Sequence, residues 1–129
     1  RELGLDGHVT FTGYLRGERY ATAMALFDTQ IFLMPGSDPT CRALREGMAL
    51  GVPSIAAQRG MLPEIVEDGV SGLVIGEGVE PLTDAMRRMA EARDAVRMLG
   101  EGARARADRL FSAPRVAEAL AALWRRAGP

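Results

Sequence analysis

The sequence predicts an α/β fold, a parallel sheet of about four strands with flanking helices and a helical C-terminus. Short apolar runs of strand length alternate with segments whose apolar residues recur at helical spacing. Strands that alternate with helices form parallel sheets through right-handed crossovers. The 129 residues contain no internal repeat, low-complexity tract or interdomain linker, so we expect one domain or part of one.

Composition predicts the strands. We expect them at residues 8–12, 31–34, 53–57 and 73–75. The first alternates, is rich in β-forming side chains and ends at Gly13. The second is a continuous apolar run that ends at Pro35, as expected of a strand buried on both faces. The third begins at Pro53, and the fourth follows the turn at Ser71 and Gly72.

Apolar spacing predicts the helices. We expect them at residues 18–27, 40–50, 63–67, 79–91, 95–110 and 114–126. In the second helix Cys41, Leu44 and Met48 form the inner stripe, and Gly51 ends it. The methionines and Trp124 fall at helical spacing and are expected in the core.

Composition also limits the function. The 16 basic and 17 acidic residues nearly cancel, so the charge indicates neither nucleic acid nor an anionic membrane as a partner. The single cysteine, Cys41, excludes an intrachain disulfide and is compatible with a reducing cytosol. The longest uncharged run, residues 47–58, is shorter than the roughly 20 apolar residues that span a bilayer. Because the chain starts without methionine and soon enters a strand-like segment, we interpret it as a fragment of a longer protein.

Two carboxylates eight positions apart mark the candidate site. Asp38 and Glu46 straddle the start of the second helix, beyond the carboxyl end of an apolar strand, where ligands of parallel sheets bind. The N–H groups of Thr40, Cys41 and Arg42, with the helix dipole, form an anion site. Eight residues of helix rise about 12 Å, near the separation of ribose and sugar in an extended sugar diphosphate.

These residues also have purely structural interpretations. Asp38 before Pro39 is a common helix start, and Glu46 can pair with Arg42 four positions earlier on a solvated face. On the pair of acids alone, this interpretation is favoured. Cys41 is expected to be a buried small apolar residue, because no histidine lies near it in the sequence.

Five blocks of sequence around this pair favour the functional interpretation instead. In order, they are VTFTGYL (9–15), IFLMPGS (31–37), EGMALGVP (46–53), LPEIV (62–66) and DGVSGL (68–73). Together they resemble the nucleotide-sugar-binding domain of the retaining glycosyltransferases of family 4, which have the GT-B fold. The resemblance implies a partial Rossmann-like sheet, half of a GT-B C-terminal domain. It implies that residues 1–129 are a single, N-terminally truncated donor-binding domain.

The resemblance also implies roles for the site. The family carries an E-x7-E motif, in which Glu46 matches the second Glu and Asp38 replaces the first, one methylene shorter. Asp38 would then be the catalytic residue that faces the donor sugar, and Glu46 would bind the ribose hydroxyls. The diphosphate would lie on Thr40, Cys41 and Arg42, although Pro39 replaces one amide donor of the family pattern.

A second loop completes the implied donor site. Residues 59–64 correspond to the family's Gly-Gly-x-Pro-Glu loop, with Met61 in place of one Gly. Gly60 permits close backbone approach to a ligand, and Glu64 is a donor-binding candidate that also suits a helix start. Arg59 either meets phosphate or is solvated, and solvation is favoured.

The resemblance implies that the complete protein is a transferase of carbohydrate biosynthesis. It would move a sugar from a nucleoside diphosphate sugar to an acceptor hydroxyl with retention, without a cofactor or metal. The acceptor would bind an N-terminal domain absent from this chain, so the fragment alone is expected to be inactive. The alternative is a non-catalytic Rossmann-like binding or interaction module that keeps the fold without transferase activity.

The resemblance further implies location and assembly. We expect a cytoplasmic protein, with peripheral attachment of the complete protein at the inner membrane face as an alternative. If the family's strand order 3-2-1-4-5-6 applies, the strands between residues 8–12 and 31–34 are missing. An unpaired sheet edge of this kind invites dimerisation.

Overall fold

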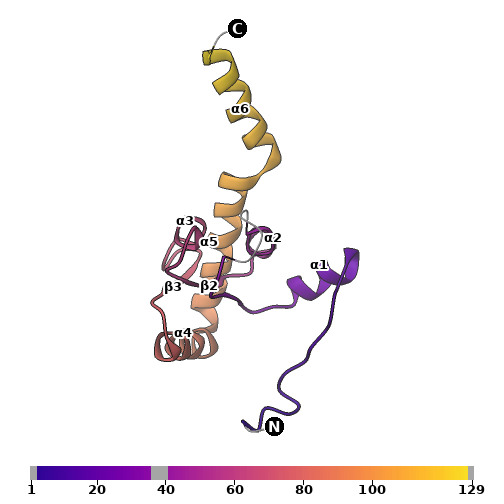
Figure 1. Cartoon of the computed structure of the whole chain (residues 1–129), viewed down its shortest axis with the longest axis vertical. Helices are drawn as coiled ribbons and strands as arrows, with labels where there is room; N and C mark the ends of the chain where they lie inside the picture. Colours follow the sequence, from indigo (N-terminus) through magenta and orange to yellow (C-terminus); the bar gives the residue numbers. More distant parts are fainter. Residues whose placement is uncertain (1–2, 36–40, 128–129) are drawn as a thin grey trace.

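The structure is a computed structural model that describes residues 3–35 and 41–127 (Figure 1). Its strands are β1 (Gln30–Phe32), β2 (Ser54–Ala57) and β3 (Gly72–Ile75). Its helices are α1 (Gly17–Ala25), α2 (Arg42–Ala49), α3 (Leu62–Ile65), α4 (Val79–Glu91), α5 (Arg93–Phe111) and α6 (Ala113–Ala127). Each of these matches an element that the apolar pattern predicts, within a few residues at its ends.

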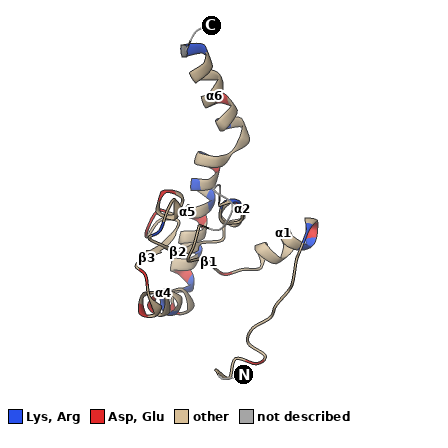
Figure 2. Cartoon of the chain, in the orientation of Figure 1, with Lys and Arg blue, Asp and Glu red and all other residues tan. Residues whose placement is uncertain are grey.

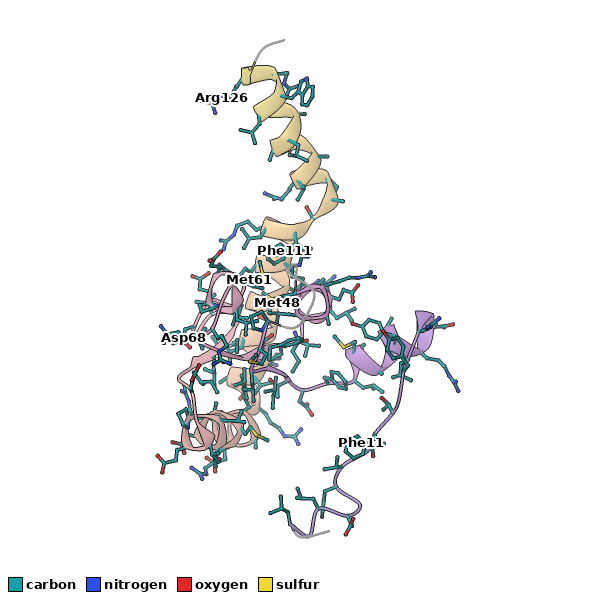
Figure 3. The ribbon with its side chains drawn as sticks, in the orientation of Figure 1. Phe11, Met48, Met61, Asp68, Phe111 and Arg126 are labelled. Atoms are coloured by element: carbon teal, nitrogen blue, oxygen red, sulfur yellow. The ribbon has the colours of Figure 1, made fainter. Side chains whose placement is uncertain are left out.

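The sheet is parallel, as predicted, with the strand order β1-β2-β3. Ile31 lies opposite Ile55, and Ile55 lies opposite Leu73. The sheet has three strands in the described chain, where the sequence predicts about four. Residues 9–12 form no strand, and Phe11 is 93% exposed on an arm that runs away from the sheet (Figure 3). Alternation makes a segment suited to a strand, but a strand forms only where a neighbour accepts its backbone hydrogen bonds.

The burial of β1 also differs from the prediction. β1 pairs only with β2, so it is an edge strand in the described chain. Ile31 is 40% exposed, and Leu33 and Met34 beyond the strand are exposed too. The prediction that this strand is buried on both faces is therefore wrong, because the face with Ile31 is incompletely covered at β1. Whether another chain pairs with this edge stays a prediction.

Helices cover both faces of the sheet, and β2 supplies a side chain to each. Ala56 packs with α2, α3 and the second half of α5, in a cluster that includes Leu44, Met48 and Ala107. Ile55 points to the opposite face, where it packs with Ala85 and Met89 of α4 and with the first half of α5. All four residues of β2 are buried, so the core lies on both sides of this central strand.

A buried glutamine fixes α2 against the sheet. Gln30 is 6% exposed, and its Nε2 donates to the carbonyl of Leu44 (3.1 Å) and to the hydroxyl of Ser54 (3.0 Å). A Cβ on Gly47 would lie 2.3 Å from Gln30 Oε1, closer than any side chain could approach. Glycine at position 47 therefore leaves room for the Gln30 amide between β1 and α2.

The C-terminal helix, α6, differs most from the prediction that its apolar side chains are buried. α6 follows α5 and projects beyond the other elements (Figure 1). Figure 2 shows α6 mostly uncharged up to its basic end at Arg125 and Arg126. Trp124 is 83% exposed, so the prediction that it lies in the core is wrong, as it is for the exposed Met34, Met86 and Met98. Helical spacing identified the apolar side of α6, but the described chain offers that side nothing to pack against.

None of the helices in the described residues is long and apolar enough to cross a membrane.

Backbone-to-backbone packing holds α5 in place. A Cβ on Gly100 would lie 2.4 Å from the carbonyl oxygen of Gly51, just after α2. A Cβ on Gly102 would lie 2.0 Å from the carbonyl oxygen of Val70, just before β3. The two glycines therefore let α5 pack directly against the loop after α2 and the loop before β3.

We predict that Gly100→Ala lowers the free energy of unfolding, although alanine is the better helix former by about 1 kcal/mol. Overpacking against an immobile backbone carbonyl costs about 1–3 kcal/mol, which outweighs that gain. Denaturant unfolding checks this, with Gly76→Ala as the control because a Cβ there meets nothing within 4 Å. Stabilisation by Gly100→Ala would contradict the packing.

Candidate functional site

The candidate site lies where β1 ends and α2 begins. Residues 36–40 connect the two and lie outside the described residues, so the predicted site residues Asp38 and Thr40 receive no structural account. α2 begins at Arg42, two residues later than predicted, with Cys41 at its N-cap. By helix geometry, the N–H groups of this first turn have no acceptor within the helix itself.

Cys41 makes the turn into α2. It is the non-glycine residue with positive φ in the described chain, at φ 47° and ψ 48°. Its side chain is 3% exposed, and its Sγ donates to the carbonyl of Pro35 at 3.2 Å. The expected burial of Cys41 is confirmed, and the thiol fastens the start of α2 to the end of the β1 segment.

Glu46 lies on the exposed side of α2, about one turn from its start. Arg42 Nε donates to its Oε1 at 2.7 Å, so the pairing expected from the four-residue spacing is present. The hydroxyl of Tyr20 on α1 donates to the other oxygen, Oε2, at 2.8 Å. Both carboxylate oxygens therefore already accept a hydrogen bond, although the side chain remains 35% exposed.

These contacts shift two pKa values in opposite directions. Burial raises the pKa of Glu46, but the hydrogen bonds from Arg42 and Tyr20 and the charges of Arg42 and Arg45 outweigh it, and the pKa falls below its ordinary value. Burial, the hydrogen bond to Glu46 and its negative charge raise the pKa of Tyr20, against a smaller effect of Arg42. The site therefore holds a charged carboxylate beside a neutral phenol.

A pocket of about 600 Å³ opens beside this carboxylate. Its lining combines aromatic, apolar and charged side chains, among them Tyr20, Phe32, Pro35, Cys41, Arg42 and Glu46. Of the predicted site residues, the structure thus brings together Cys41, Arg42 and Glu46. Gly60 and Glu64 are not among the described residues that line the pocket.

The loop with Gly60 nevertheless lies next to the pocket wall. Gly60 has φ +54°, and a Cβ on it would lie 2.8 Å from Pro35 Cγ. The preceding Arg59 forms an ion pair with Glu77 at 2.7 Å and donates to Met34 Sδ at 2.7 Å. Arg59, expected to be solvated, is 44% exposed, and it also links the loops that follow all three strands.

The sequence is similar to that of a known family of proteins. Residues 1–106 match the sequence profile described as glycosyl transferases group 1. The chain belongs to this family. Over 128 residues it is 40% identical to a D-inositol 3-phosphate glycosyltransferase of Saccharomonospora viridis, covering 98% of this chain and 29% of that protein.

Solved structures of glycosyltransferases with the GT-B fold match this group 1 chain as well. Sucrose-phosphate synthase of Thermosynechococcus elongatus superimposes with a TM-score of 0.81 at 26% identity, over 97% of this chain and 31% of that one. HepE of Anabaena, solved in complex with UDP-glucose, gives 0.77 at 27% identity, over 94% and 34%. The chain thus spans about a third of the length of each of these three proteins.

Glu64 of this group 1 chain is held by a residue that the sequence analysis missed. Arg106 on α5 donates from Nη2 to the carbonyl of Glu64 (2.8 Å) and from Nε to that of Ile65 (2.7 Å). It also forms an ion pair with Glu67, and its side chain is 14% exposed. No local pattern indicates this contact, because its partners lie about 40 positions earlier in the chain.

We predict that Arg106→Met lowers the free energy of unfolding by about 2–3 kcal/mol, because two hydrogen bonds from a charged donor are lost and the part-buried carbonyl of Ile65 loses its partner. Methionine keeps the apolar stem of the side chain. Arg104→Met, on an exposed position of the same helix, should change stability by less than about 0.5 kcal/mol. Equal effects of the two variants would contradict the role of Arg106.

We also predict that Arg42→Ala raises the pKa of Glu46, while Arg88→Ala on α4 leaves it unchanged. The measurement is an NMR titration of the Glu46 side-chain carbon. Because the pKa of Glu46 is lowered on folding, its contribution to stability is present above its unfolded pKa and disappears as the pH falls through the folded value. In Arg42→Ala this acid-side loss should be smaller and should be complete at a higher pH, and an unchanged pKa of Glu46 would contradict the pairing.

Proposed function

We propose that this chain is the donor-binding part of a retaining glycosyltransferase, which transfers a sugar from a nucleoside diphosphate sugar to an acceptor hydroxyl. The observation that supports this best is Glu46, a charged carboxylate held at a pocket beside the start of α2 in a group 1 chain. The relative solved with UDP-glucose supports the class of donor.

The chemistry of the pocket suits such a donor. A carboxylate oxygen has two lone pairs, so Glu46 can accept from ribose hydroxyls while Arg42 and Tyr20 stay bound. α2 begins beside the pocket, so the positive end of its dipole favours a diphosphate there. Thr40 would add to this site and Asp38 would face the sugar.

The second loop has a supporting part in this proposal. Gly60 lies against Pro35 in a conformation that favours glycine, so its backbone can border the donor without a side chain between them. Glu64 follows on α3, where Arg106 fixes the backbone. We assign both to donor binding rather than to the reacting atoms.

Catalysis would then rest on positioning and on stabilisation of the departing diphosphate by basic groups and helix N–H groups, without a metal. Asp38 orients the sugar and is not assigned as a nucleophile. The chain spans about a third of its relatives, so we propose that the acceptor binds to another domain of the complete protein and that this chain alone is inactive.

We predict that the complete encoded protein binds at least one nucleoside diphosphate sugar of a panel, measured by isothermal titration calorimetry. Glu46→Ala should weaken binding about 10- to 100-fold, because hydrogen bonds to a charged acceptor are lost. Glu101→Ala, which removes an exposed acid of α5, should bind like the wild type.

The outcomes separate the two candidate functions. If the wild type binds no donor, or Glu46→Ala binds equally well, the donor-site assignment fails. If the wild type binds a donor that depends on Glu46 but transfers no sugar to any acceptor or to water, the non-catalytic binding module is favoured.

A further inference from the structure

Tyr20 joins the candidate site from a distant part of the sequence. It lies on α1, 26 positions before Glu46, and its hydroxyl donates to Glu46 Oε2 at 2.8 Å. α1 otherwise contacts the body sparingly, since Met24 is its buried residue while Leu26 is 77% exposed. A single polar contact therefore connects a lightly packed helix to the carboxylate of the site.

The carboxylate of a glutamate needs such a contact to hold one orientation. The terminal torsion of a glutamate side chain has broad preferences, so the rotamer alone does not set the plane of the two oxygens. Arg42 Nε binds Oε1 at 2.7 Å, and the Tyr20 hydroxyl binds Oε2. Two donors, one on each oxygen, fix that plane, and each oxygen keeps one lone pair for a further donor.

We propose that Tyr20 is a positioning residue that orients Glu46 to accept both the 2′- and the 3′-hydroxyl of a donor ribose. The proposal rests on the assignment of Glu46 to the ribose. Two adjacent hydroxyls match the two oxygens of one carboxylate only when its plane faces them, so Tyr20 sets the preference for ribonucleotides over deoxyribonucleotides. Tyr20 itself touches Glu46 and acts through it.

A purely structural role of the hydrogen bond between Tyr20 and Glu46 would give a different result when that bond is removed. If the hydrogen bond served only to hold α1, its removal would lower stability and affect all nucleotides alike. An orienting role changes the ratio between ribonucleotide and deoxyribonucleotide affinities. That ratio is also insensitive to partial unfolding, because a loss of competent protein scales both apparent dissociation constants equally.

The experiment compares UDP and GDP with their 2′-deoxy and 3′-deoxy forms, by calorimetry on the complete encoded protein. Wild type should prefer the ribonucleotide. In Tyr20→Phe the affinity for the ribonucleotide should fall about tenfold while the deoxy forms change little, so the preference shrinks. Thr83→Val is the control, because it removes an exposed hydroxyl of α4 that is not among the described residues lining this pocket.

Different binding results would contradict the role of Tyr20 and the proposed function. If wild type binds neither UDP nor GDP in any form, the proposed function falls, and the role of Tyr20 falls with it. If wild type prefers the ribonucleotide and Tyr20→Phe keeps the same ratio, the orienting role is overturned while donor binding stands. A preference lost equally in Thr83→Val would also overturn it.

Discussion

The close contact between Gln30 and Gly47 is the constraint on which the rest of the site depends. Gln30 bonds to the backbone of α2 and to Ser54 of β2, and the bare Cα of Gly47 gives it room. Glu46 immediately precedes this glycine, so the contact that seats α2 on the sheet also sets where the carboxylate emerges. A helix displaced by even one methyl group would move Glu46 away from both Tyr20 and the end of β1.

α5 supplies the matching constraint from the other side of α2. Gly100 lets its backbone touch the residue after α2, and Arg106 holds the carbonyls at the end of α3. α5 thus contacts the backbone just after α2 and the backbone at the end of α3, the two helices that follow the loops of the candidate site.

Periodicity predicted most of the fold because the apolar stripes of α2, α4 and α5 do face a core. It was wrong for segments that have an apolar side but no partner to cover it. A pattern shows which side of a segment could pack, but it does not show whether a neighbouring element is present. Residues 9–12 and Trp124 are exposed for that reason. In the site, the four-residue spacing predicted the contact between Arg42 and Glu46, whereas Tyr20 could not be found, because only the fold brings it near. Asp38 lies outside the described residues.

The pairing of Glu46 with Arg42 does not exclude a functional role for Glu46. An unpaired carboxylate on a helix surface would be solvated and free to rotate, and a ligand would have to order it at a cost in affinity. Arg42 and Tyr20 remove that freedom before any ligand arrives, and their hydrogen bonds keep the group charged. The same contacts that satisfy Glu46 in the free chain therefore leave it oriented and ionised, which is the state that a sugar diol requires of its acceptor.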